Sequence, residues 1–270
     1  MHQISNRRKT VTTVSRNLYN HYMRKFFCLF ITLALFSPLT AKSHIEIAEE
    51  NSPAIVAINV LKKDGTTFNG TGFVVTQDGV IATSRHVVEG AMFVNVTFNT
   101  GAISGEAKPF VQAGEVDLAL IKIEAKNLPT VSLADSDYVR TGEEITVIGN
   151  PRRLQNTVTS GLISQVRQKS DGIIWHQISA PISPSSSGSP VFNKDGHVIS
   201  VAFSSYKGEG NQNLNFSVPS NYLVKLLNAK NYFPPVASPT QKEASSVWSK
   251  FSNHIAKAWE MVCRPFQRVK

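Results

Sequence analysis

The chain has little cysteine: two residues among 270, Cys28 and Cys263. Cys28 lies in a segment that we expect to be cleaved off, so the mature chain would have no intramolecular disulfide, and its stability must come from packing. No cluster of cysteine and histidine has the spacing of a zinc site, and no glycine pattern of a phosphate-binding loop or a dinucleotide-binding fold occurs. The sequence therefore implies no metal or organic cofactor.

Acidic residues are missing from positions 1–41, which hold six Lys and Arg. Residues 239–270 hold six more, against two glutamates. The excess of basic residues that gives the chain its formal net charge of +9 lies at its two ends. Residues 42–238 have a net charge of −1. The basic balance of the whole chain is consequently no sign that its central body binds nucleic acid.

An uncharged apolar run, Phe26–Phe36, is too short for a comfortable membrane span. Two basic residues precede it and Ala41 offers a small residue for cleavage, which is the arrangement of a secretory signal peptide over residues 1–41. The unusually long stretch before Met23 makes that residue an alternative start. We expect secretion across the inner membrane to a periplasmic or extracellular location, with an uncleaved signal anchor as the alternative.

Short β-branched runs separated by turn signals fill residues 55–218, with a spacing typical of sandwiches and barrels. They divide into two nearly equal series around Leu128–Gly142, which favours two β-barrels of about six strands over one large sheet. Ile45–Ala54 and Pro219–Leu227 are expected to form short flanking helices. The runs are Ile55–Leu61, Gly72–Thr76, Val80–Thr83, Phe93–Phe98, Leu118–Ile123, Glu144–Ile148, Asn156–Ser164, Ile173–Ile178, Val191–Phe192, Val198–Phe203 and Asn213–Val218.

The C-terminal segment 233–270 is expected to hold a proline-rich linker and an amphipathic helix from Ala244. Three alternatives are open for this helix: packing on the barrels or in an oligomer, peripheral attachment of residues 244–266 to an anionic membrane, and disorder. Its apolar residues recur at steps of three to four: Val247, Phe251, Ile255, Trp259, Val262 and Phe266.

A serine-rich stretch, Ala180–Asn193, reads A-P-I-S-P-S-S-S-G-S-P-V-F-N and places Ser187 before Gly188. A serine hydroxyl is a weak nucleophile that needs a neighbouring base and a cradle for the oxyanion that it creates. A tight turn of small residues can supply that cradle, because successive backbone N–H groups can point at one spot. Taken alone, such a stretch is more often a plain polar loop.

Two further residues are candidates for the base and its partner. His86 follows the strand Val80–Thr83, at the end of an element where a side chain can reach a cleft. Asp117 opens an apolar strand, and a carboxylate there must find a partner because burying an unpaired charge is costly. A structural histidine and an exposed strand-end aspartate are the alternatives, and Glu115 is the nearest competitor for the acid.

Five segments in order resemble the trypsin-like serine peptidases of the bacterial HtrA/Deg type: T-S-R-H-V-V-E-G, V-D-L-A-L-I-K-I, G-N-P, T-V-T-S-G-L-I-S and S-S-S-G-S-P. The likeness covers about Ile45–Leu227, and His86, Asp117 and Ser187 follow the order of chymotrypsin-fold proteases. It implies an all-β peptidase domain over residues 42–232, built of two six-stranded antiparallel β-barrels that meet at the catalytic cleft.

The resemblance also implies roles. Ser187 would attack the scissile carbonyl of a polypeptide, His86 would transfer the proton, and Asp117 would hold the imidazole. No acidic residue stands at Pro181 or Ile182, which favours aliphatic side chains in the primary specificity pocket. The expected oxyanion-hole residues are Ser185, Ser186 and Ser187, and the expected substrate-binding residues are Ile182, Val201, Ala202 and Phe203.

Ser185 departs from the family pattern, which has glycine there. A serine in that turn either takes a positive φ, at roughly 1 kcal/mol, or leaves the peptide flipped. A catalytically weak or inactive chymotrypsin-fold binding protein is therefore the alternative to a serine endopeptidase acting in protein quality control. The residues after Leu227, about forty, are expected to be too few for the PDZ domain that HtrA-type proteins commonly carry.

Overall fold

The computed structural model describes residues 41–98, 104–150, 156–205, 214–235 and 237. The predicted signal peptide, apart from Ala41, and the predicted helix from Ala244 lie outside these residues. The described residues from Lys42 onward belong to one compact unit. Within the described ranges, no helix is long and apolar enough to cross a membrane.

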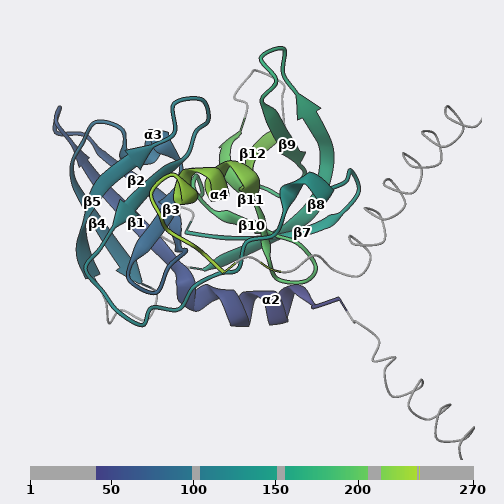
Figure 1. Ribbon diagram of the computed structural model, residues 1–270, viewed down its shortest axis with the longest axis horizontal. Helices are drawn as coiled ribbons and strands as arrows, with labels where there is room; N and C mark the ends of the chain where they lie inside the picture. Colours follow the sequence, from purple (N-terminus) through teal and green to yellow (C-terminus); the bar gives the residue numbers. More distant parts are fainter. Residues whose placement is uncertain (1–40, 99–103, 151–155, 206–213, 236, 238–270) are drawn as a thin grey trace, which may run out of the picture. The chain divides into compact units, whose positions relative to one another are not determined.

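Twelve strands close into two antiparallel barrels of six, which confirms the expected all-β architecture (Figure 1). The strand order around the first barrel is β1-β2-β3-β6-β5-β4, and the second repeats it as β7-β8-β9-β12-β11-β10. The first barrel comprises β1 Ile55–Lys62, β2 Thr67–Val74, β3 Val80–Thr83, β4 Ala91–Phe98, β5 Ser104–Gln112 and β6 Ala119–Lys122; the second comprises β7 Glu144–Gly149, β8 Thr157–Gln168, β9 Ile174–Ile178, β10 Pro190–Phe192, β11 Val198–Ser205 and β12 Asn215–Pro219.

The flanking helices are short. α2, His44–Asn51, begins with a capping box between Ser43 and Glu46, and its His44 Nδ1 lies 2.7 Å from Thr146 Oγ1 on β7. This tie fixes the lead-in segment to the second barrel. The remaining helices are η1 Ser52–Ala54, α3 Arg85–Val88, η2 Ser136–Tyr138 and α4 Ser220–Asn228.

The main core is continuous from the first barrel into the second. Its cluster of buried aliphatic residues includes Ile58 and Leu120 in the first barrel, Val201 on β11, and Leu223 and Leu227 of α4. A smaller cluster fills the second barrel around Ile145, Val147, Ile163 and Ile178. Burial of this shared apolar surface holds the two barrels together. The loops at their junction therefore begin and end at strands whose positions are fixed.

Candidate functional site

His86 and Asp117 are in direct contact. The backbone N–H of His86 donates to Asp117 Oδ1 at 2.9 Å, and the ring Nδ1 lies 2.6 Å from Oδ2. An ionised carboxylate only accepts hydrogen bonds, so this contact favours the tautomer with the proton on Nδ1 and a free lone pair on Nε2. One oxygen of the Asp117 carboxylate thus holds the backbone of α3, and the other sets the orientation of the His86 imidazole.

Arg85, which the sequence reasoning did not single out, ties the loop that carries Asp117 to α3. Its Nη1 donates to the carbonyl oxygens of Ala113 at 3.0 Å and Gly114 at 3.2 Å. The Ala113 N–H donates in turn to the Leu118 carbonyl, which closes the loop on the far side of Asp117. The sequence feature that could have pointed to Arg85 is its position directly before the candidate histidine, His86.

Ser187 lies where the loop before β10 meets both barrels. Its carbonyl accepts from the Thr71 N–H on β2 at 2.9 Å, and its Oγ donates to the Phe203 carbonyl on β11 at 3.2 Å. Gly188 has φ +90°, and a Cβ there would lie 2.1 Å from the Thr71 carbonyl oxygen. Only glycine permits this approach.

The helix of His86 is held to the same junction. The Ser84 hydroxyl, one residue before α3, donates to the Ala202 carbonyl at 3.3 Å, and the Gly188 N–H donates to that carbonyl at 2.7 Å. Within the described ranges no hydrogen bond joins Ser187 Oγ to His86. A change of χ1 to another staggered rotamer would turn this small hydroxyl away from Phe203.

Ser183–Ser186 form a type II turn in front of the nucleophile candidate. The Ser186 N–H donates to the Ser183 carbonyl at 3.0 Å, Pro184 fixes a negative φ at the second position, and Ser185 has φ +75° at the third. Ser185 therefore adopts the strained alternative of the two considered from the sequence. The expectation for Ser186 is corrected, because its N–H is engaged inside the turn.

Thr71 connects this turn to the second barrel. Its Oγ1 donates to the Ser185 carbonyl at 2.9 Å and accepts from the Asn150 N–H at 2.9 Å. The peptide between Ser185 and Ser186 is consequently held at both ends, its oxygen by Thr71 and its N–H by Ser183. The peptide between Pro184 and Ser185, which carries the Ser185 N–H, is the one left to rotate.

The four expected substrate-binding residues separate into two pairs. Val201 and Ala202 are fully buried, in the main and the smaller core cluster respectively, so their side chains pack in the interior; this corrects the expectation that they line a pocket. Ile182 and Phe203 are half-buried. The Phe203 ring packs edge-on against Trp175, with centroids 5.1 Å apart.

His176 is a buried histidine of a different kind. It is 1% exposed on β9, its Nδ1 has no hydrogen-bond partner among the described residues, and burial lowers its pKa from 6.5 to about 4. Desolvation disfavours the charged imidazolium, so His176 is neutral near pH 7. Among the described residues, His176 makes no hydrogen bond to Ser187.

Comparison with known proteins agrees with this geometry. A family model described as "Trypsin-like peptidase domain" matches residues 70–201. A "Probable periplasmic serine endoprotease DegP-like" of Chlamydia muridarum is 40% identical over 156 residues, covering 56% of this chain and 31% of that protein. "Serine protease HTRA1B" of Danio rerio is 33% identical over 195 residues, covering 67% and 40%. The chain thus spans about a third of the length of the bacterial relative.

Solved structures show the same likeness. "HtrA-type protease AlgW with tripeptide" superposes with a TM-score of 0.64 at 28% identity, covering 69% of this chain and 63% of that one. The structure titled "Crystal structure of Deg5" superposes with a TM-score of 0.58, also at 28% identity, covering 67% and 90%. These neighbours share the arrangement of two six-stranded barrels.

Proposed function

This chain belongs to the trypsin-like peptidases of the HtrA/DegP type, and from that premise we propose that it is a serine endopeptidase with His86, Asp117 and Ser187 as its catalytic triad. The observation that carries the proposal is the double contact of Asp117 with His86, through Oδ1 to the backbone and Oδ2 to Nδ1. A carboxylate in this position holds the imidazole in the tautomer that a general base needs.

In the proposed reaction, the Ser187 hydroxyl turns from the Phe203 carbonyl to His86 Nε2. It then attacks the substrate carbonyl while its proton passes to Nε2. The tetrahedral intermediate collapses when His86 returns that proton to the leaving amine, which breaks the peptide bond and leaves an acyl ester on Ser187. Water, deprotonated by the same nitrogen, hydrolyses the ester and restores the hydroxyl.

The backbone N–H groups of Ser185 and Ser187 are the proposed oxyanion donors. Neither donates to a backbone carbonyl among the described residues, whereas the Ser186 N–H does. The positive φ of Ser185 supports an assembled cradle, because a type II turn and its flipped type I form differ in the direction of this N–H. That observation favours an active peptidase over the alternative of a silent binding protein.

The proposal extends to polypeptide substrates, a peptidase domain over residues 42–232, and secretion to the periplasm. A tripeptide bound to AlgW and the word periplasmic in the name of the DegP-like relative support these points. A role in protein quality control predicts faster cleavage of unfolded chains such as casein than of a compact folded protein, and cleavage after aliphatic residues rather than Lys or Arg.

Labelling by a fluorophosphonate, which esterifies an activated serine, tests the proposal directly. The full chain should be labelled and should cleave casein, and Ser187→Ala should abolish both. Ser183→Ala is the matched control, because it removes an exposed hydroxyl from the same loop and should leave labelling unchanged. A wild-type chain that is neither labelled nor active would be the binding protein instead.

A further inference from the structure

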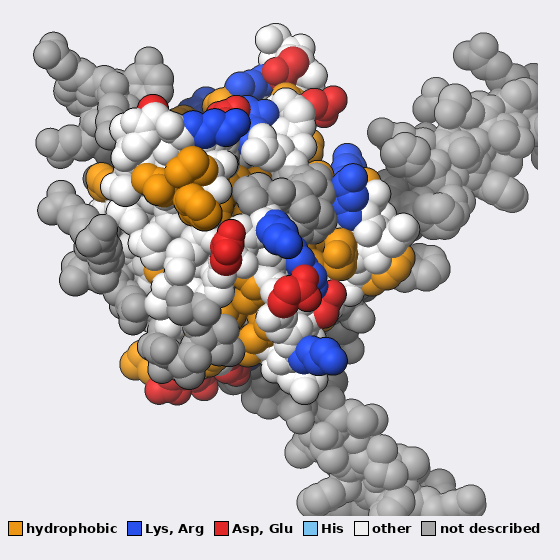
Figure 2. Space-filling view, turned by 90° about the vertical axis from the view of Figure 1, so that its left-hand side faces the viewer, with side chains coloured by type: hydrophobic (Ala, Val, Ile, Leu, Met, Phe, Trp, Pro, Cys, Tyr) orange, Lys and Arg blue, Asp and Glu red, His pale blue; other side chains and the backbone are white. Residues whose placement is uncertain are grey.

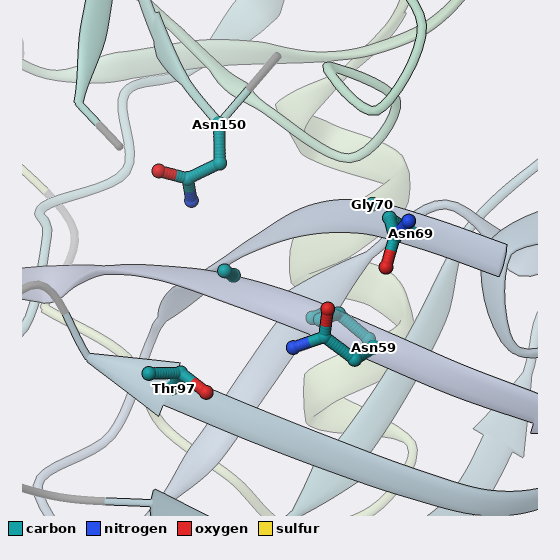
Figure 3. A pocket seen from close by; sticks show the side chains of 7 residues that line it. Asn59, Asn69, Gly70, Thr97 and Asn150 are labelled. Carbon is teal, nitrogen blue, oxygen red and sulfur yellow. The ribbon is translucent and has the colours of Figure 1, made fainter. Parts of the chain in front are cut away.

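A pocket of about 170 Å³ with three asparagines in its lining opens on the outer face of the first barrel (Figure 3). Strands β2, β1 and β4 supply most of its lining, and Asn150, at the end of β7, closes it from the second barrel. The residues that line it are Ala57, Ile58, Asn59, Asn69, Gly70, Thr97 and Asn150.

Asn150 gives this pocket an unpaired hydrogen-bond donor. The residue is 2% exposed, its Oδ1 accepts from the Asn156 N–H at 3.0 Å, and its Nδ2 has no partner among the described residues. Figure 3 shows the amide pointing toward the strands that carry Asn59 and Thr97. A buried N–H without an acceptor is rare in native proteins and indicates a bound water or ligand.

A second hollow of about 330 Å³ continues the first, because the two share Asn59 and Asn69. These two asparagines are paired across β1 and β2, and Asn95 pairs with Asn59 on the other side, so a row of carboxamides crosses the sheet. Beyond the row lie Leu61 and Phe93, the latter 52% exposed.

The face of the first barrel therefore carries a groove that is polar at Asn150 and apolar at Phe93. No charged side chain lines either part. Figure 2 shows the side of the molecule that lies at the left of Figure 1, where exposed apolar side chains occur together with both basic and acidic ones. The groove thus selects a neutral ligand with a carbonyl acceptor at one end and an apolar group at the other.

We propose that this groove binds a short extended segment of uncharged peptide. One carboxamide of the ligand accepts from Asn150 Nδ2 and exchanges hydrogen bonds with Asn59 and Asn69, whose amides supply both donors and acceptors. The adjoining aliphatic side chain packs on Leu61 and Phe93. An amide matches this lining better than a carboxylate or a phosphate, because no cation is present to balance a negative charge.

The site is connected to the oxyanion turn. The same Asn150 donates its backbone N–H to Thr71, which donates to the Ser185 carbonyl. Packing is tight beside it, since a Cβ at Gly149 would lie 2.3 Å from Ser189 Oγ. A ligand that immobilises Asn150 stabilises this chain of hydrogen bonds and, with it, the positive-φ turn. This regulatory consequence rests on the proposed function, whereas the binding itself does not.

Binding is measured with the full-length Ser187→Ala chain, which cannot cleave the ligand, and N-acetyl-Asn-Leu-amide as the probe. Side-chain amide NMR signals of Asn59, Asn69 and Asn150 should shift and saturate. N-acetyl-Asp-Leu-amide, of the same shape with a negative charge, should bind at least tenfold more weakly, about the loss expected for an unmatched buried group. Equal shifts with both peptides, or none with either, would overturn the proposal and leave Asn150 to an ordered water.

Two variants locate the site. Asn59→Leu fills the pocket from the half-buried outer face of β1 and should abolish the shifts of Asn150. Asn127→Asp, at an exposed loop position, is the control and should bind as the parent does. Binding that survives Asn59→Leu would place the peptide elsewhere.

A rise in the molecular mass of the chain in solution with its concentration, if Asn59→Leu abolishes it, would instead assign the groove to a second copy of the chain.

Activity is tested separately with the wild-type chain. The probe should raise the rate of fluorophosphonate labelling several-fold, and the rise should be lost in Asn59→Leu. Peptide binding in a chain that is never labelled would refute the endopeptidase while leaving the groove intact. Labelling with no binding would refute the groove alone, and binding with an unchanged labelling rate would refute the coupling through Thr71.

Discussion

The hydroxyl of Thr71 donates to the carbonyl oxygen of Ser185 across 2.9 Å and joins β2 of the first barrel to the loop that carries Ser187. The hydroxyl oxygen of Thr71 also accepts a hydrogen bond from the backbone N–H of Asn150 in the second barrel. One threonine therefore holds the oxyanion turn against both barrels, and the shape of the proposed cradle depends on how the barrels dock.

Thr71→Val should lower peptidase turnover about tenfold, since it keeps the shape of the side chain and leaves the Ser185 carbonyl and the Asn150 N–H without their partner. KM should change less than kcat, because the turn contacts the developing oxyanion. Steady-state kinetics on a peptide substrate measure both. Thr141→Val, at an exposed position before β7, is the control, and equal losses in the two variants would remove the special role of Thr71.

Ser185→Gly should raise turnover, by up to about fivefold. The positive φ of +75° costs a serine roughly 1 kcal/mol that glycine does not incur, so glycine shifts the turn toward the form with its N–H aimed at the oxyanion. Ser185→Val should act in the opposite direction, because a β-branched residue tolerates positive φ poorly. Unchanged or lower turnover in the glycine variant counts against this account.

Arg85→Ala should reduce kcat/KM by roughly tenfold to a hundredfold, because the loop of Asp117 loses its two hydrogen bonds to Nη1. The proposed effect is on position, so added guanidinium should restore part of the activity, and Arg85→Lys should retain an intermediate level. NMR of the His86 Nδ1 proton should show the change directly. A loss of thermal stability with no rescue by guanidinium would mean that Arg85 only supports the fold.

Residues at the ends of strands could be predicted from the sequence, because a strand is visible as a run of apolar β-branched residues and its end is where that run stops. His86 and Asp117 adjoin apolar β-branched runs, and their distance of 2.6 Å follows from β3 pairing with β6. β5, Ser104–Gln112, was missed because glycine, proline and charges interrupt its sequence, and its register shifts between Pro109 and Val111.

Other parts of the site could not be predicted because they depend on contacts between the barrels. Thr71 meets Asn150 across 79 positions of sequence, and no local pattern marks either residue. Val201 and Ala202 were assigned to the specificity pocket because the family resemblance and the apolar character of the stretch Val201–Phe203 pointed there. β11 is buried on both faces at this point, with Val201 in the main cluster and Ala202 in the smaller one.

His176 should make the folded state sensitive to acid. Burial lowers its pKa from 6.5 to about 4, so between these values the unfolded chain binds a proton that the folded chain does not. The resulting decrease in the free energy of unfolding is absent above pH 6.5. It grows as the pH falls toward 4, where it reaches about 3 kcal/mol. The strand neighbours of His176, Val166 and Ser217, carry no charge that would offset it.

Urea unfolding at pH 7.5 and at pH 4.5 measures this dependence. In His176→Leu, which keeps an apolar group in the same space, the fall in unfolding free energy between the two pH values should be smaller by about 2 to 3 kcal/mol. The variant should still be labelled by a fluorophosphonate at pH 7.5, because His176 is neutral there and makes no hydrogen bond to Ser187. An equal pH dependence in both chains would show that the buried imidazole is protonated in the folded state.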